Sequence, residues 1–376
     1  MFTCLIAAVQ SAIPNGGPGP TYTNTAFISP TGGSGALNNK AEPFLTVADA
    51  VNDLVFNEGV GSATLRLLGN IGTDNLTGID PTQWDFLLTN GLTIMSDGGA
   101  QYTVGADLSF GTQLNASLTL VNVALQSLTK SGHEGYTSDN AGTITGDSRT
   151  TIGTLNLSAD PTAADAGTDG GDGTTTYGSP GANGSDGSPP TDGSPGGDAD
   201  ASGGDAGSGA NGNAAWTVTL MGSFTVTTIN GNGGAGGDGG EGGSGATATG
   251  GTGGNGGSGL DDGMGDSFQG GNGGNGGNAT SNGGQGGDGG TGGNASYVNY
   301  EAAVTITSPV GSGGAGGNAG GGGYGGSASG GAGGFSGNGF NSAAGNPGSN
   351  GGSESLQGDE GTNGATGYSI TLNEIG

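Results

Sequence analysis

The chain has 376 residues, of which 97 are glycine and only 30% are hydrophobic, so an ordinary apolar core cannot extend through all of it. It carries 32 acidic and four basic residues, a formal net charge of −28 at pH 7. Because nucleic acids and anionic membranes are bound through clustered Lys and Arg, this charge argues against both as partners. The last basic residue is Arg149, so the glycine-rich second half is purely anionic. A lone cysteine, Cys4, excludes a disulfide framework within the chain.

Residues 1–20 are expected to form an N-terminal docking segment and a linker. The stretch 2–9 is apolar, but it is short for a membrane span and lacks the basic region of a secretion signal. We therefore expect no membrane insertion and interpret the stretch as an assembly element that docks onto a partner or onto the first coil of its own chain. The alternative is a frayed hydrophobic terminus. The expected assembly residues are Phe2, Leu5, Ile6 and Val9.

Residues 21–159 are expected to form a β-helix domain that opens with a short helix. Six apolar residues between Phe44 and Val55 fall on one face at helical spacing, and Thr46 with Asp49 resembles a capping box. Short β-prone segments follow, separated by glycine and asparagine turns. Alternation inside them places apolar side chains on one face, which predicts stacked strands. The segments are 63–68, 86–88, 92–95, 102–104, 108–110, 118–123 and 152–157.

The order of a strand, the turn Ser29-Pro30-Thr31-Gly32-Gly33-Ser34-Gly35 and the helix start Pro43-Phe44-Leu45-Thr46 resembles a known family. It looks like the entry and capping helix of right-handed parallel β-helix proteins of the pectate-lyase-like superfamily. The resemblance covers roughly residues 24–160. It implies an all-β fold, a right-handed parallel β-helix, an architecture frequent in phage tail fibres, tailspikes and bacterial surface proteins.

Residues 160–376 are interpreted as strand rungs interrupted by three glycine-rich excursions, at 160–213, 231–295 and 310–366. Within the second excursion, Gly-Gly-X triplets fill 233–244, 250–258, 270–278 and 283–294. Polyproline II has three residues per turn, so such triplets leave bare glycine edges along which chains can approach closely. We expect four short polyglycine II helices, joined by turns and packed in a bundle; disorder is the alternative that composition favours.

Glycine recurs only once per triplet at 178–187 and again at 358–367. This spacing is like that of collagen, but the runs are short and the first is broken. We favour extra polyproline II strands on the rim of the bundle over a collagen stalk.

Two patterns bear on metal binding. The stretches 233–238 and 283–288 match the start of the calcium-binding G-G-x-G-x-D repeat, but glycine then stands at 240 and 290 where that repeat needs an apolar residue. Asp261, Asp262 and Asp266 cluster in a turn and offer oxygen ligands for a hard cation; a solvated acidic turn is the alternative. We expect no cofactor, with calcium left open.

Catalysis has weaker support in the sequence. The β-helix resemblance implies that polysaccharide lyases and hydrolases are among the relatives. Carboxylates are present at positions 80, 85, 97 and 107, but no spacing singles out a pair, and Lys130 and Arg149 are isolated. We therefore expect no enzyme, while a polysaccharide depolymerase stays open.

Recognition is the best supported function. Large side chains are scarce in the glycine-rich blocks, and several stand where the runs break, as expected for loop tips on a rigid scaffold. The alternative is that they pack back onto the bundle. The candidate receptor-binding residues are Tyr177, Met264, Phe268, Tyr324, Phe335 and Phe340.

The Gly-Gly-X pattern itself resembles two families. One is the distal adhesin of some phage long tail fibres, in which a polyglycine II sandwich presents loops to host outer-membrane proteins. The other is the mycobacterial glycine-rich surface proteins, whose helical N-terminal domain has no counterpart in residues 1–60.

Taken with the β-helix entry, the first resemblance predicts an extracellular virion protein, a tail fibre or tail tip, that binds a host glycan or outer-membrane protein. Its other expected partners are virion tail or fibre proteins, through the N-terminus, and further copies in a homotrimer. The alternatives are a self-assembling secreted or cell-surface filament protein and a β-helix polysaccharide depolymerase.

Overall fold

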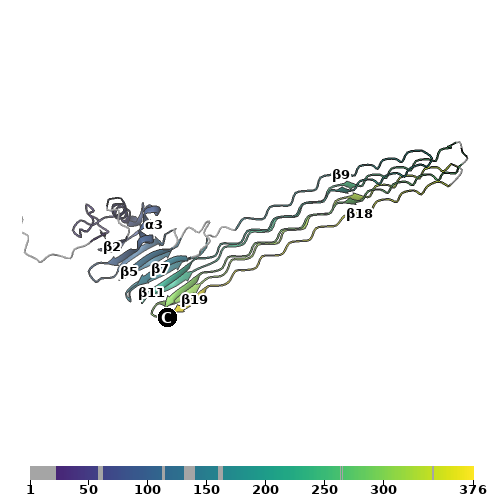
Figure 1. The fold of residues 1–376 in the computed structure, drawn as a ribbon. Helices are drawn as coiled ribbons and strands as arrows, with labels where there is room; N and C mark the ends of the chain where they lie inside the picture. Colours follow the sequence, from purple (N-terminus) through teal and green to yellow (C-terminus); the bar gives the residue numbers. More distant parts are fainter. Residues whose placement is uncertain are drawn as a thin grey trace, which may run out of the picture.

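The computed structural model describes residues 23–57, 62–111, 115–130, 140–159, 164–262, 264, 266–340 and 343–376. It has two parts, a stack of strands and a long bundle of extended glycine-rich segments that projects from the stack (Figure 1). The expected docking segment, with Phe2, Leu5, Ile6 and Val9, lies outside the described residues.

Two parallel sheets form the stack, and from β3 onward the chain visits them alternately. An all-β, mainly parallel fold was predicted and is confirmed. The larger sheet has the order β1 (Thr25–Ile28), β2 (Ala63–Leu67), β3 (Leu92–Ser96), β5 (Ala116–Val121), β7 (Asn140–Gly146), β11 (Thr217–Gly222), β15 (Tyr297–Glu301) and β19 (Thr371–Ile375). The smaller has the order β4 (Tyr102–Ser109), β6 (Val123–Thr129), β8 (Thr151–Asn156), β12 (Thr225–Asn230) and β16 (Thr305–Val310).

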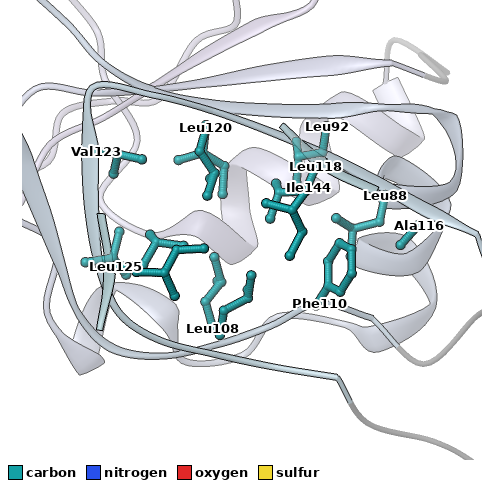
Figure 2. Packing of buried hydrophobic residues seen from close by; sticks show 14 of the residues in the cluster. Leu88, Leu92, Leu108, Phe110, Ala116, Leu118, Leu120, Val123, Leu125 and Ile144 are labelled. Atoms are coloured by element: carbon teal, nitrogen blue, oxygen red, sulfur yellow. The ribbon is translucent and has the colours of Figure 1, made fainter. Parts of the chain in front are cut away.

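The apolar core lies between these sheets. Side chains alternate along a strand, so Leu118 and Leu120 of β5 are buried while Thr119 between them is half-buried. Leu118 pairs with Leu92 on one side and Ile144 on the other, so like residues stack from strand to strand. Figure 2 shows these side chains filling the interior.

Short helices pack against the first strands: α1 (Val47–Asn52), the π-helix η1 (Asp53–Asn57), α2 (Thr73–Leu76) and α3 (Pro81–Asn90). Thr46 is confirmed as the N-cap, because its hydroxyl accepts the Asp49 N–H at 3.0 Å; the Asp49 carboxylate accepts from that hydroxyl at 2.7 Å rather than completing a capping box. The expected strand at 86–88 is wrong. Asp80 caps α3 by accepting the Thr82 N–H at 2.8 Å, and Pro81 suits the first helical position. Residues 86–88 therefore form part of a helix instead of a strand.

Three times the chain leaves the stack, runs to the far end of the bundle and returns (Figure 1). Excursions follow β8, β12 and β16, and the returning chain enters β11, β15 and β19. We call the six extended segments arms. They are arm 1 (164–187), arm 2 (191–215), arm 3 (231–259), arm 4 (270–295), arm 5 (311–340) and arm 6 (345–368).

The arms form two layers, with outgoing arms 1, 3 and 5 in one and returning arms 2, 4 and 6 in the other. Within a layer, the Gly236 N–H donates to the Ala315 carbonyl at 2.9 Å; between layers, the Gly237 N–H donates to Ala210 at 2.8 Å. Both kinds of hydrogen bond recur every third residue along much of each arm. Central arms 3 and 4 therefore bond to four arms each, whereas arms 1 and 6 bond to two.

The number of neighbours sets the number of glycines. A Cβ built at Gly254 in arm 3 would overlap the Ala182 carbonyl, and one at Gly290 in arm 4 would overlap the Ala210 carbonyl. In arms 3 and 4, two of the three residues in each triplet have such contacts, and these arms use Gly-Gly-X triplets. Arms 1 and 6 carry the runs with one glycine per triplet, which agrees with the rim position expected for them.

The expectation of four short helices joined by turns is wrong, because the runs at 233–244 and 250–258 both belong to arm 3. The interruption between them is extended chain, in which β13 (Ala248–Thr249) pairs with β9 (Thr176–Tyr177) and β17 (Ala328–Ser329). The opposite layer repeats this with β10 (Ala199–Asp200), β14 (Ala279–Thr280) and β18 (Ser353–Glu354). Between the layers lies a small buried cluster: Ala199, Ala201, Ala248 and Ala279.

This cluster explains the interruption in physical terms. Where the arms take up strand geometry, a methyl group fits between the layers, and the glycine triplets resume beyond it in a new phase. Whether 1–20, 21–159 and 160–376 behave as separate folding units stays a prediction, since that is a property of unfolding.

Candidate functional site

Asparagine and aspartate side chains link neighbouring arms along the outer faces of the bundle. The regular backbone pattern uses the glycine N–H groups of the triplets and leaves the N–H of the X residue without a carbonyl acceptor. In many triplets an Asx oxygen of the neighbouring arm accepts this N–H instead. Asp169 accepts from Glu241 at 2.9 Å, Asn255 from Phe335 at 3.0 Å, and Asn272 from Asn346 at 2.8 Å. We call this array the Asx ladder.

The ladder has a fixed register. Donor and acceptor are 72 residues apart between arms 1 and 3, 80 between arms 3 and 5, and 74 between arms 4 and 6. Other side-chain acceptors in the same role are Asp172, Asn183, Asp186, Asp192, Asp198, Asp205, Asn211, Asn232, Asp238, Asn275, Asn278, Asn282, Asp288 and Asn294.

Many aspartate side chains of the bundle thus have a structural role, because they accept hydrogen bonds from the neighbouring arm. The backbone N–H and then the hydroxyl of Thr362 lower the pKa of Asp288 below its ordinary value of 3.8. Sequence reasoning missed the ladder. Its signal was the recurrence of Asx and X residues at constant separations, which becomes visible only once the arms are aligned.

The distal tip is formed by the three turns that join the arms in pairs. The Leu260 N–H donates to the Gly187 carbonyl at 3.0 Å, and the Ser188 hydroxyl donates to the Leu260 carbonyl at 2.6 Å. Phe268 and Phe340 exchange two backbone hydrogen bonds, at 3.0 and 2.8 Å. All three turns are therefore tied together.

Of the six candidate receptor-binding residues, Met264, Phe268 and Phe340 lie at this tip. Met264 is 81% exposed, while the two phenylalanines are half-buried. Leu260, 49% exposed, belongs with them and was missed. The available signal was an apolar residue that ends a Gly-Gly-X run.

Tyr177, Tyr324 and Phe335 do not lie at loop tips, which corrects their expected location. Tyr177 is in β9, and the Tyr324 and Phe335 carbonyls accept ordinary inter-arm hydrogen bonds, each at 2.8 Å. All three side chains are more than 70% exposed on the outer face of the outgoing layer. An X residue there points away from the neighbouring arms, so a large side chain needs no turn.

The acidic turn at the tip does not gather its carboxylates. Asp262 accepts the Met264 N–H at 2.8 Å, an interaction that shapes the turn. Within the described residues, which include Asp261, Asp262 and Asp266, no group of three or more His, Cys, Asp and Glu side chains is placed to hold a metal ion.

In the strand stack, carboxylates considered for catalysis make structural contacts. Asp97 binds Arg66 at 2.7 Å and also Lys40. Burial raises its pKa, but the hydrogen bonds from Lys40 and Arg66 outweigh that and lower the pKa below 3.8. Asp107 accepts the Thr129 hydroxyl at 2.9 Å. That the chain is not an enzyme stays a prediction.

Lys130 is buried where arm 2 rejoins the stack. Its ammonium lies 4.8 Å from the ring centre of Trp216 and 5.7 Å from that of Phe110. Burial lowers the pKa of Lys130 to about 8, although the charge of Asp85 acts in the opposite direction. Lys130 is therefore a structural element of this junction.

No protein-family model and no curated protein matches the chain. Among solved structures, a springtail antifreeze protein from Granisotoma rainieri, described as a bundle of nine polyproline type II helices, is 28% identical. The alignment covers 50% of this chain and 94% of that chain, with a TM-score of 0.07, so the likeness carries no argument. In the described part of the chain, no helix is long and apolar enough to cross a membrane.

Proposed function

We propose that this chain is a structural, adhesive protein that presents a receptor-binding tip at the end of a rigid spike. The strand stack is its base, interpreted as a right-handed β-helix. The six arms are interpreted as polyglycine II helices, because their hydrogen bonds recur with the three-residue turn of polyproline II. The setting we favour is extracellular, in a virion tail fibre or tail tip.

The observation that carries this proposal is the joined tip. Hydrogen bonds connect the turn after arm 1 to Leu260, and connect Phe268 to Phe340. Three separate excursions thus supply one surface, held in place by the arms behind it. Loops fixed on a rigid scaffold are suited to recognition because little entropy is lost when they bind.

The spike supplies reach. Arm 3 spans 231–259, and at 3.1 Å per residue such a segment is about 90 Å long. Inter-arm hydrogen bonds along that length oppose bending. A tip held this far from the base can contact a cell surface while the base stays in a larger assembly.

The chemistry of the tip suits a protein or glycan receptor. Met264 and Leu260 offer exposed apolar surface there, and the flexible thioether side chain of methionine adapts to irregular partners. Phe268 and Phe340 add aromatic surface next to them. The receptor we propose is a host-surface outer-membrane protein or glycan, and partners at the N-terminus would anchor the base.

Adsorption of labelled protein to candidate bacterial cells tests the proposal. The variant Leu260→Ser/Met264→Ser should lose most of the saturable binding. Leu356→Ser is the matched control, because Leu356 is 56% exposed on arm 6, away from the tip, and should bind as the parent does. Saturable binding that survives the tip variant, or no saturable binding to any host strain, would overturn the tip assignment.

Self-assembly is the second candidate, favoured by one observation. Among the strands of the described residues, β19 pairs with β15 alone and forms one edge of the larger sheet, and Leu372 on it is 37% exposed. If strands of two copies pair here, sedimentation should show concentration-dependent oligomers that Leu372→Lys removes. A monomer at all concentrations would exclude this route to filaments.

A further inference from the structure

A shallow trough crosses the outer face of the outgoing layer, part-way along the bundle. It has a volume of about 440 Å³ and is formed by arms 1, 3 and 5. Its exposed lining side chains are Pro180, Asn183, Thr252, Asn255, Ala332 and Phe335. The volume falls in the range of small-molecule sites.

The Asx ladder fixes the geometry of one wall. Asn183 accepts the Asn255 N–H at 2.8 Å, and Asn255 accepts the Phe335 N–H at 3.0 Å, so these residues form a row across three arms. Each amide oxygen is held, and in the described residues no acceptor engages either amide nitrogen. Two pre-oriented amide donors therefore stand beside the exposed ring of Phe335.

The trough is uncharged, although the chain carries −28. Acidic ladder residues lie elsewhere on the same face, including Asp172 toward the base and Asp186 toward the tip. Their field repels an anionic ligand. A neutral ligand rich in hydroxyl groups suits the site, because amide N–H groups donate to hydroxyl oxygens and an aromatic face packs against the C–H face of a sugar ring.

A second exposed ring extends the site. Tyr177 of arm 1 is 74% exposed and lies in a row with Thr249 and Ser329, which follows the same register as the row of Asn183. The two rows are six residues apart, about 19 Å at 3.1 Å per residue. A sugar ligand that reaches both rings therefore has to be an oligosaccharide.

We propose that this trough binds a neutral oligosaccharide, with one sugar ring stacked on Phe335 and hydroxyl groups accepting from the amides of Asn183 and Asn255. The sugar chain continues toward Tyr177. The inference rests on the proposed adhesive function, for which it names a ligand class, but it uses residues away from the tip.

Titration calorimetry with maltohexaose, cellohexaose and chitohexaose tests it. At least one should bind, and Phe335→Ala should weaken that binding tenfold or more. The corresponding disaccharide should bind more weakly than the hexaose. A sharper variant is Asn183→Asp/Asn255→Asp, which keeps the ladder oxygens but removes both amide donors, so it should abolish binding with no change in melting temperature.

Aspartate already fills the ladder role at positions 169 and 238, which makes that double variant compatible with the fold. The matched control is Asp238→Asn, a ladder change outside the trough, which should leave oligosaccharide binding unchanged. Absence of binding by all three hexaoses, or binding that Phe335→Ala leaves intact, would overturn the proposal.

The two proposals fail separately. Cell adsorption that needs the tip but not Phe335, with no hexaose bound, retains the adhesive function and removes the trough site. Phe335-dependent hexaose binding without any cell adsorption retains the trough site and removes the adhesive function.

Discussion

The carboxylate of Asp238 in arm 3 accepts the backbone N–H of Asn318 in arm 5 at 2.8 Å, across 80 residues of sequence. It also accepts from the Asn318 side-chain amide at 3.1 Å. This one contact shows how a chain with so few apolar residues is ordered. Backbone groups that a conventional fold would leave to water are paired, here by the neighbouring arm or by a side chain extending from it.

Removal of this ladder contact should cost stability. Asp238→Ala leaves the Asn318 N–H without its acceptor and should lower the free energy of unfolding by about 1 kcal/mol. Asp238→Asn keeps an oxygen at the same place and should be close to neutral. Thermal unfolding followed by circular dichroism distinguishes the two, and equal melting temperatures for both variants would contradict a structural role for the ladder.

Glycine should be indispensable where it faces a neighbouring arm and replaceable where it faces away from the other arms. Gly254→Ala forces a methyl group into the Ala182 carbonyl, so we expect a loss of about 3 kcal/mol or more. Gly321→Ala is the control, because a Cβ there meets nothing within 4 Å. It should be neutral or slightly stabilising. A similar melting temperature for the two variants would show that the layers are less closely packed than described.

Acid should weaken the bundle. Hydrogen bonds from Thr362 lower the pKa of Asp288 below 3.8, so the folded state favours the carboxylate. The resulting stability is present above pH 3.8 and is lost as the pH falls through the lowered pKa. Asp288→Asn should reduce the dependence of melting temperature on pH in this acid range. An identical acid profile for parent and variant would contradict the prediction.

Alkaline pH should have the opposite effect at Lys130. Its pKa falls from 10.5 to about 8 on folding, so between these values the unfolded chain binds the extra proton. Stability should therefore rise as the pH increases from about 8 toward 10.5. Lys130→Met removes the titrating group and should flatten this rise, measured by denaturant unfolding at pH 7.5 and 10. A parent protein whose stability falls over the range, with the same slope in Lys130→Met, would contradict it.

The sequence predicts the strand stack well where a local pattern decides the outcome. Thr46 and Asp49 are three residues apart, so their cap could be recognised, and the alternation of Leu118, Thr119 and Leu120 revealed the buried face of β5. The single strand expected at 118–123 is in fact the end of β5 and the start of β6. The strand predicted at 86–88 is wrong because its β-prone residues were considered without the residues that precede them. Asp80 and Pro81, a short distance upstream, start the helix that contains them.

The bundle was harder because its determinants are not local. A Gly-Gly-X run indicates close neighbours but does not say which arm supplies them, and Ala248 looks like a break until Ala199 and Ala279 are found beside it. The same limit applies to the candidate site. Phe335 and Phe340 stand five residues apart in sequence, yet one lies on the side of the bundle and the other at its tip.

The fixed register of the arms also constrains how such a protein can evolve. A triplet added to arm 3 alone would shift every ladder contact beyond it on both sides, since arms 1 and 5 would no longer match. Lengthening is tolerated only when all six arms gain the same increment, or when the addition is confined to a turn. The length of the bundle is therefore fixed by the register of its six arms, while the three turns at its end can change in sequence and length.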